Sequence, residues 1–226
     1  ASQEGPLGLN DLMQGECYDA RKENICEWHP VTEKQFGYEN LVCSNSFDVV
    51  EKENYTGKQI HTPNGEVVID FGQNIAGYVK FGFYAQAGQC ITLYHGECLD
   101  QNGNFTQENF QAPEHRVEQC VKYICKEGWN EYKPEKSIFG FRYIKAITDV
   151  KVTEKNFTAI AVYSDMPQTG KFECGHPGIN QLFSNAVWSM KGNFLEIPTD
   201  CPTRERTGFT GDAQVFVNTG MYLMEC

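Results

Sequence analysis

The chain has 226 residues, of which 40% are hydrophobic, so it can bury a sizeable core in one large domain or two small ones. Thirty acidic residues against nineteen basic ones give a formal net charge of −11, which disfavours binding to nucleic acid and to anionic membrane surfaces. The sequence has no apolar run of about 18 residues to span a bilayer, and its first residues lack the basic and apolar regions of a signal peptide.

The first 60 residues show no clear periodicity. They mix Gly, Asn and charged residues with isolated aromatic residues such as Tyr18, Trp28 and Tyr38. The segment 11–28 holds at most a short strand or turn. We therefore expect a loop-rich connector that packs on another part of the protein.

Residues 61–167 carry short β-branched and aromatic runs, separated by turn residues. The runs lie at 67–72, 78–85, 90–99, 120–126, 139–150 and 158–164. Val79, Phe81 and Phe83 alternate with smaller or more polar residues, which is the period of a strand with one buried face. This spacing predicts an antiparallel β-sandwich. The polar stretch 101–118 interrupts it and is typical of a functional loop.

After Gly170 the hydrophobic period changes to that of an α-helix. One apolar stripe runs from Ile179 to Met190, with Pro177 near the helix start and Gly192 at its end. A second stripe runs from 213 to 224, with Thr210 or Asp212 as candidate N-caps. Two helices with such wide apolar faces cannot bury them alone, so we expect a fragment of a larger helical domain. Docking of both helices on the sandwich is the alternative.

The segment between the helices is the densest polar cluster flanked by apolar residues: Asp200, Arg204, Glu205, Arg206 and Asp212. Adjacent cations would lower a carboxyl pKa there, whereas burial against Phe209 and Trp188 would raise it. Glycoside cleavage needs both kinds of carboxyl group, an acid and a base or nucleophile. The alternative is that Arg204 and Glu205 form a solvated pair and Asp212 only caps a helix.

Ten cysteines lie at positions 17, 26, 43, 90, 98, 120, 125, 174, 201 and 226. Their density is low for a disulfide scaffold and no CxxC pair occurs, so we favour buried thiols in a reducing compartment, the cytoplasm over secretion. Cys174 and His176 could offer two metal ligands, but turn and cap chemistry is favoured. His95 is favoured as a hydrogen-bonded core residue. Nothing in the sequence indicates a catalytic metal or another cofactor.

The segment GNFLEIPTDCPTRERTGFTGDAQVF (192–216) resembles the signature region of bacterial α-L-rhamnosidases, glycoside hydrolase family 78. GECYDAR (15–21) resembles the stretch that leaves the family's N-terminal β-domain. VIDFGQNIAGYVKF (68–81) and FGFRYIKA (139–146) resemble its concanavalin-like β-sandwich, and residues 170–194 resemble the start of its (α/α)6 barrel. The resemblance implies a connector and β-domain remnant over 1–60, the sandwich over 61–167 and a truncated barrel over 168–226.

The resemblance also implies an inverting glycosidase acting on terminal α-L-rhamnosides, with Glu205 as general acid. Asp200, Arg204 and Asp212 match positions that hold the hydroxyl groups of rhamnose. The general base would lie beyond Cys226, so we expect no turnover by the fragment alone. Phe209 stands where the family commonly has Trp. The expected partners are the rhamnoside and the rest of the barrel, with self-association through the exposed helical faces.

A different class of function is also compatible with these residues. The sandwich could be a non-catalytic carbohydrate-binding module, or a domain that only supports the barrel.

Overall fold

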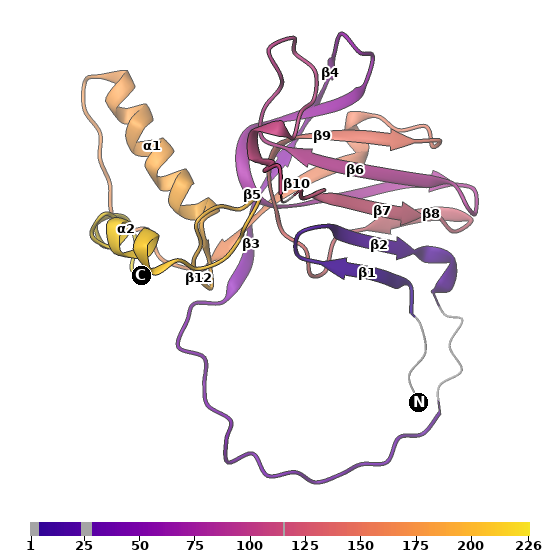
Figure 1. The fold of residues 1–226 in the computed structure, drawn as a ribbon, viewed down its shortest axis with the longest axis horizontal. Coiled ribbons are helices and arrows are strands. Elements are labelled where there is room, and N and C mark those ends of the chain that lie inside the picture. The colour runs from indigo at the N-terminus through magenta and orange to yellow at the C-terminus, as the bar shows by residue number, and fades with distance from the viewer. Residues whose placement is uncertain (1–4, 24–28, 115) are drawn as a thin grey trace.

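The computed structural model describes residues 5–23, 29–114 and 116–226. Cys26 and Trp28 lie outside these ranges. The described part is mainly β: one curled sheet is followed by two α-helices at its side (Figure 1). The strands of the sheet are β1 (Leu7–Asp11), β2 (Gly15–Asp19), β3 (Val49–Thr56), β4 (Lys58–His61), β5 (Val67–Ala85), β6 (Cys90–Gly96), β7 (Cys120–Ile124), β8 (Gly128–Tyr132), β9 (Phe139–Thr148) and β10 (Phe157–Ser164).

Ten described strands form one hydrogen-bonded sheet, where the sequence predicted an antiparallel sandwich. The order is β1-β2-β7-β6-β9-β5-β10-β3, and β4 and β8 pair with β5. The long strand β5 connects the other strands into one sheet. Its first half pairs with β4 and β9, and its second half pairs with β8 and β10. The register with β9 shifts between Asp70 and Ile75, and such an irregularity bends a strand. Among the described strands, β2 and β7 form the one parallel pair.

The core lies on the inner face of the curled sheet. Val79, Phe81 and Phe83 of β5 are all buried, as their alternation predicted. The ring of Phe81 contacts that of Tyr123 edge-on at 5.3 Å, and the rings of Tyr123 and Tyr132 lie 5.2 Å apart. Such aromatic pairs stabilise a core beyond the area that they bury.

Within the described part of the first 61 residues there are four strands, where the sequence indicated a connector with at most a short strand. β2 lies beside β7, and its Glu16 is buried. The carboxylate of Glu16 accepts hydrogen bonds from the Tyr132 hydroxyl at 2.7 Å and the Ser137 amide at 2.7 Å. Residues 29–48, all of them described, contain neither helix nor strand. Almost all of them are exposed, so the expected packing of this segment on another part of the protein is largely absent among the described residues.

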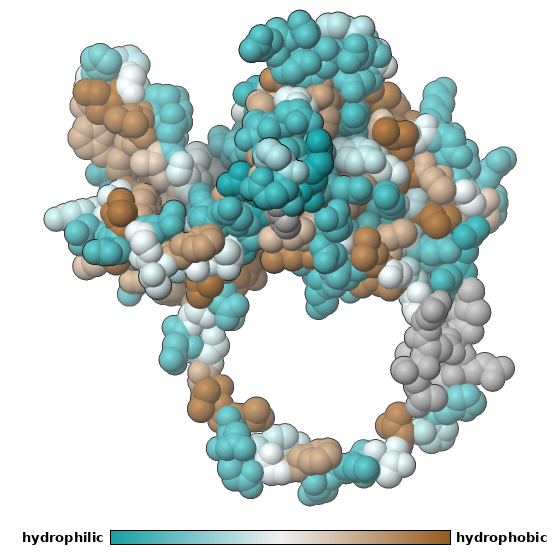
Figure 2. Space-filling view, viewed as in Figure 1, coloured by the Kyte–Doolittle hydropathy of each residue, from teal (hydrophilic) through white to brown (hydrophobic). Residues whose placement is uncertain are grey.

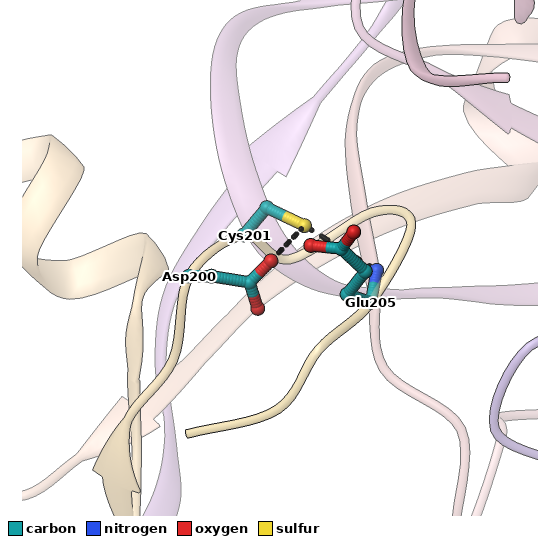
Figure 3. A group of neighbouring side chains, drawn as sticks. All are labelled: Asp200, Cys201 and Glu205. Carbon is teal, nitrogen blue, oxygen red and sulfur yellow. Dashed lines mark hydrogen bonds between the residues drawn. The ribbon is translucent and has the colours of Figure 1, made fainter. Parts of the chain in front are cut away.

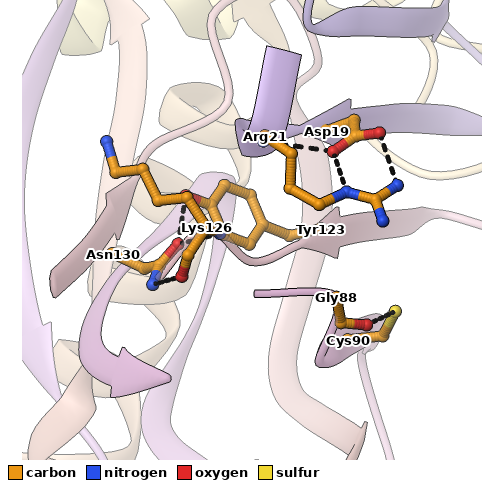
Figure 4. Close-up of polar contacts among 7 residues, drawn as sticks. All are labelled: Asp19, Arg21, Gly88, Cys90, Tyr123, Lys126 and Asn130. Atoms are coloured by element: carbon orange, nitrogen blue, oxygen red, sulfur yellow. Dashed lines mark hydrogen bonds and ion pairs between the residues drawn. The ribbon is translucent and has the colours of Figure 1, made fainter. Parts of the chain in front are cut away.

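Polar contacts also fix the end of the sheet that β2, β7 and β8 form (Figure 4). Asp19, at the end of β2, accepts from the Arg21 guanidinium at 2.8 Å and 2.9 Å. The buried Asn130 accepts from the Tyr123 hydroxyl at 3.1 Å and donates to the Lys126 carbonyl at 2.9 Å. These bonds satisfy backbone groups of the β7–β8 turn, which would otherwise be costly to bury.

The helices α1 (Pro177–Gly192) and α2 (Thr210–Leu223) confirm the helical periodicity, including Pro177 at the start of α1 and Gly192 at its end. The N-cap of α2 is Phe209, with no side-chain capping bond. The expectation that Thr210 or Asp212 caps this helix is therefore wrong, because both residues already lie in its first turn.

α1 packs on the sheet through Trp188, whose ring meets that of Tyr55 edge-on at 6.1 Å, and through an ion pair of Lys191 with Glu53 at 2.7 Å. Apolar side chains on both helices remain open to solvent (Figure 2), and Val215 is 86% exposed. Within the described residues, neither helix is long and apolar enough to cross a membrane.

Candidate active site

The segment that joins the two helices carries the predicted site. A short hairpin of β11 (Phe194–Leu195) and β12 (Ile197–Pro198) leads into it. The loop then closes on itself, because the Asp200 amide donates to the Thr207 carbonyl at 3.1 Å and the Thr207 amide donates to the Asp200 carboxylate at 3.2 Å. We call residues 199–209 the acid loop.

The acid loop brings Asp200, Cys201 and Glu205 together (Figure 3). One carboxylate oxygen of each acidic residue and the Cys201 sulfur all lie within 4.8 Å of one another. The Cys201 thiol donates to Asp200 at 3.2 Å, and its sulfur accepts the Glu205 backbone amide at 3.4 Å. Arg204 reaches the Glu205 carboxylate at 3.3 Å, with both side chains partly exposed. Three of the four predicted site residues, Asp200, Arg204 and Glu205, therefore lie together.

The two carboxyl groups have pKa values that are shifted in opposite directions. The Asp200 carboxyl raises the pKa of Glu205 through hydrogen bonding, and partial burial adds to this, while Arg204 opposes it. Partial burial alone would raise the pKa of Asp200, but hydrogen bonds from Glu205, Cys201 and Thr207 outweigh it and lower that pKa. Glu205 thus holds a proton more firmly than Asp200 does, which is how one site keeps an acid beside an ionised carboxylate.

The sequence alone left the direction of these shifts open. The flanking arginines would lower a carboxyl pKa there, whereas burial beside Phe209 and Trp188 would raise it. In the structure, the leading cause of the raised pKa of Glu205 is its neighbour Asp200. Asp200, Cys201 and Glu205 could together ligate a cation. The opposite directions of the two pKa shifts are those of a proton donor beside an ionised carboxylate.

Asp212, the fourth predicted residue, lies exposed in the first turn of α2. No hydrogen bond or ion pair among the described residues connects it to Glu205. Asp212 and Asp200 instead line one pocket of about 870 Å³, which lies between α1, α2 and the end of β10. The pocket therefore relates Asp212 to Asp200, whereas Arg204 and Glu205 do not line it.

Arg206 anchors the acid loop to the sheet, a role that the sequence did not reveal. Its buried guanidinium donates to the carbonyls of Thr203 at 2.7 Å, of Ile138 at 2.8 Å, and of Leu12. Burial lowers the pKa of Arg206 to about 10. Its three closest partners are backbone carbonyls from separate segments, and the fourth is the Gln119 side chain at 3.5 Å. Backbone partners leave no pattern in the sequence.

The strand β9 forms the floor beneath the acid loop. A Cβ atom on Gly140 would lie 2.6 Å from the Thr203 side chain and 2.8 Å from Pro202, so the loop rests directly on this glycine. The neighbouring Phe139 ring lies 5.5 Å from the Arg206 guanidinium and stacks on His95 at 4.2 Å.

His95 and His176 both have the structural roles that the sequence favoured. His95 is fully buried with Nδ1 3.0 Å from the Gln119 carbonyl, and burial lowers its pKa to about 3. His176 is the N-cap residue of α1, and the Cys174 thiol donates to its carbonyl at 3.7 Å. The nine described cysteines are free thiols. Of these nine, Cys120 and Cys125 alone are buried, so the expectation of buried thiols is wrong for the other seven.

Comparison with known proteins gives the same family over both parts of the chain. Residues 60–163 match the bacterial α-L-rhamnosidase concanavalin-like domain, and residues 167–226 match the bacterial α-L-rhamnosidase six-hairpin glycosidase domain. The α-L-rhamnosidase of Streptomyces avermitilis is 34% identical over 236 residues, which cover 98% of this chain and 22% of that protein. That of Alteromonas sp. (strain LOR) is 35% identical over 240 residues, covering 100% of this chain and 26% of the relative.

Solved structures agree. The native α-L-rhamnosidase of Aspergillus terreus aligns with a TM-score of 0.86 and 32% identity, covering 98% of this chain and 27% of that one. The Streptomyces avermitilis enzyme in complex with L-rhamnose aligns with a TM-score of 0.84 and 32% identity, covering 97% of this chain and 22% of that one. The chain spans about a quarter of the length of these relatives. From matches to both domains, which together cover residues 60–163 and 167–226, we conclude that the chain belongs to the bacterial α-L-rhamnosidase family.

Proposed function

We propose that the protein to which this chain belongs hydrolyses terminal α-L-rhamnosides, with Glu205 as the general acid. The observation that carries the proposal is the carboxyl pair of the acid loop, in which Asp200 raises the pKa of Glu205. A general acid must still hold its proton at the working pH, and a like-charged neighbour provides this. The names of the relatives and the L-rhamnose bound to one of them indicate the sugar.

In the proposed reaction, Glu205 gives its proton to the glycosidic oxygen as the bond from that oxygen to the anomeric carbon breaks. Asp200, Arg204 and Asp212 hold the hydroxyl groups of rhamnose as hydrogen-bond acceptors and donors. Water attacks the anomeric carbon from the opposite face and loses a proton to a second carboxylate, which inverts the configuration. By the family resemblance this base is supplied by residues beyond Cys226.

We further propose the finer architecture that the family suggests. Residues 1–60 are a connector and the remnant of an N-terminal β-domain, 61–167 a concanavalin-like β-sandwich, and 168–226 the start of an (α/α)6 barrel. The break between the two family matches, after 163 and before 167, supports the second boundary. The exposed apolar side chains of α1 and α2 support a partner surface formed by the rest of the barrel, or self-association in its absence.

The decisive experiment follows hydrolysis of aryl α-L-rhamnosides by the full-length protein, its Glu205→Gln variant and this 226-residue chain. We expect turnover by the full-length protein and none by the chain. Removal of a general acid lowers kcat by about 10²- to 10⁴-fold. We expect the decrease in Glu205→Gln to be smaller for aryl groups that leave without protonation. Glu173→Gln, an exposed residue of the linker before α1, is the control.

Two outcomes would contradict the proposal. Full activity of Glu205→Gln on poor leaving groups would remove Glu205 from the reaction. Binding of rhamnosides by the full-length protein without any turnover would instead favour a non-catalytic carbohydrate-binding module.

A further inference from the structure

A second pocket, of about 360 Å³, opens beside the acid loop, between the sheet and α1. Its volume lies near the lower end of the range of about 300–1,000 Å³ that small-molecule sites occupy. The residues that matter here are Gln73 and Asn74 of β5, Glu97 after β6, Asn185 and Trp188 of α1, and Pro202 of the acid loop. Pro202 belongs to the acid loop, which also carries Glu205, although Glu205 itself does not line the pocket.

Glu97 is held in a fixed orientation on the sheet side of this pocket. One carboxylate oxygen accepts from the Asn74 side-chain amide at 3.1 Å, and the other accepts from the Asn109 amide at 3.0 Å. Asn109 lies in the stretch 101–118, which the sequence indicated as a functional loop. Each carboxylate oxygen has a further lone pair, so Glu97 can still accept hydrogen bonds from a ligand.

The opposite wall of the pocket offers further hydrogen-bonding groups. Asn193 lines this wall at the end of α1, and its side-chain amide donates to the Ser189 carbonyl at 2.8 Å. The exposed Asn185 side chain accepts from Gln181 at 2.8 Å, and its own amide hydrogens can donate to a ligand hydroxyl. Trp188 adds an aromatic ring that Lys191, 4.4 Å from the ring centre, holds in place.

Carboxylate, amide and indole groups are together suited to a polyhydroxylated ligand, because each hydroxyl both donates and accepts and the sugar ring has apolar faces. Among the described residues that line the pocket, Glu97 alone is charged. A neutral sugar would therefore be accepted, whereas a uronic acid would bring a second negative charge beside Glu97 without a cation to balance it.

We propose that this pocket is the leaving-group subsite and that Glu97 selects neutral sugars over uronic acids as the group to which rhamnose is attached. The proposal rests on the proposed function, because the general acid protonates the oxygen that departs with the leaving group, so that group must lie on the side of Glu205. The sheet thereby contributes to substrate choice, while the acid loop performs the chemistry.

The test compares two disaccharides in the full-length protein, α-L-rhamnosyl-glucose and α-L-rhamnosyl-glucuronic acid. Glu97→Gln keeps the shape of the side chain and removes its charge. We expect its kcat/KM to fall about tenfold on rhamnosyl-glucose, mainly through KM, because one charge-assisted hydrogen bond is weakened. On rhamnosyl-glucuronic acid we expect kcat/KM to rise, because the repulsion is gone. A structural defect would lower both values.

Asn185→Ala tests the helix side of the pocket without touching Glu97, and we expect it to raise KM for both disaccharides by a smaller factor. Glu173→Gln is again the matched control. Two outcomes would overturn the proposed subsite. One is an equal change in kcat/KM on the two disaccharides in Glu97→Gln, and the other is an unchanged KM in both Glu97→Gln and Asn185→Ala. If the unmodified protein failed to hydrolyse even an aryl α-L-rhamnoside, the proposed function itself would fall, and the subsite with it.

Discussion

The guanidinium of Arg206 donates a hydrogen bond to the carbonyl oxygen of Ile138 over 2.8 Å, and this bond ties the residue after the candidate acid to the start of β9. A second bond from the same guanidinium reaches Leu12, between β1 and β2. The position of Glu205 is therefore set in part by the sheet, although Glu205 itself lies between two helices.

Replacing Arg206 by Lys should lower kcat of the full-length protein by about 10- to 100-fold, because an ammonium group cannot make the same set of bonds and a small displacement of a catalytic group is costly. We expect the loss to grow as the leaving group becomes poorer, since the displaced group is the acid. The measurement is a series of aryl α-L-rhamnosides.

The control for this series is Arg116→Lys, an exposed arginine that pairs with Glu108 at 2.8 Å. A loss in Arg206→Lys that is the same for every leaving group would show that the anchor supports the fold without placing the acid.

Gly140→Ala should push the acid loop away from β9. The added methyl group would lie within 3 Å of Thr203 and Pro202, so the loop must move. We expect kcat to fall at least about tenfold and the free energy of unfolding to fall by about 1–3 kcal/mol, as overpacking typically costs. Urea denaturation and steady-state kinetics measure the two effects.

Gly175→Ala is the matched control, because a Cβ atom there has no neighbour within 4 Å. Normal kinetics in Gly140→Ala would mean that the loop tolerates the shift and that its contact with β9 does not position Glu205.

Asp200→Asn should move the alkaline limb of the kcat/KM profile to lower pH. The limb reports the loss of the proton from the general acid, and the Asp200 carboxyl raises the pKa of Glu205. Without that carboxylate Glu205 loses its proton at lower pH, so activity falls earlier as pH rises.

Asp212→Asn separates this effect from sugar binding. It also removes a candidate rhamnose ligand, so activity should fall, but the limb should stay in place. A limb that stays unmoved in Asp200→Asn, or that moves equally in both variants, would argue against the coupling of Asp200 and Glu205.

Glu16→Ala should lower the free energy of unfolding by about 3 kcal/mol, because it leaves the buried Tyr132 hydroxyl and the Ser137 amide without their acceptor. Urea denaturation of the variant checks this value. Glu118→Ala, an exposed residue 3.8 Å from Lys122, should change stability by less than about 0.5 kcal/mol. Equal changes in the free energy of unfolding for Glu16→Ala and Glu118→Ala would mean that β2 contributes little to the stability of the sheet.

Much of the fold could be predicted because its central elements follow simple periods. The alternation in β5 and the helical stripes of α1 and α2 both appear where the sequence placed them. The strand β3 was missed because its sequence, VVEKENYT, lies at the edge of the sheet and has no continuous buried face. The parallel pairing of β2 with β7 joins segments about 100 residues apart, and no local pattern records it.

The candidate site was predicted as a group of residues but not as a geometry. The motif placed Asp200, Arg204 and Glu205 on one loop, and the structure brings their side chains together. The shift in the pKa of Glu205 depends on how the loop folds back on Asp200, which composition cannot show. The anchor Arg206 was beyond prediction because it binds backbone carbonyls.

The pairing of β2 with β7 and of β3 with β10 has a consequence for how this sheet could be inherited or transplanted. The family match begins at residue 60, yet a gene segment cut there would leave β7 and β10 with bare edges, which invite pairing between chains. Recombination that moves the sheet intact into another protein must therefore carry residues 7–19 and 49–61 as well. The unit that recombination can move intact is therefore larger than the domain whose family model begins at residue 60.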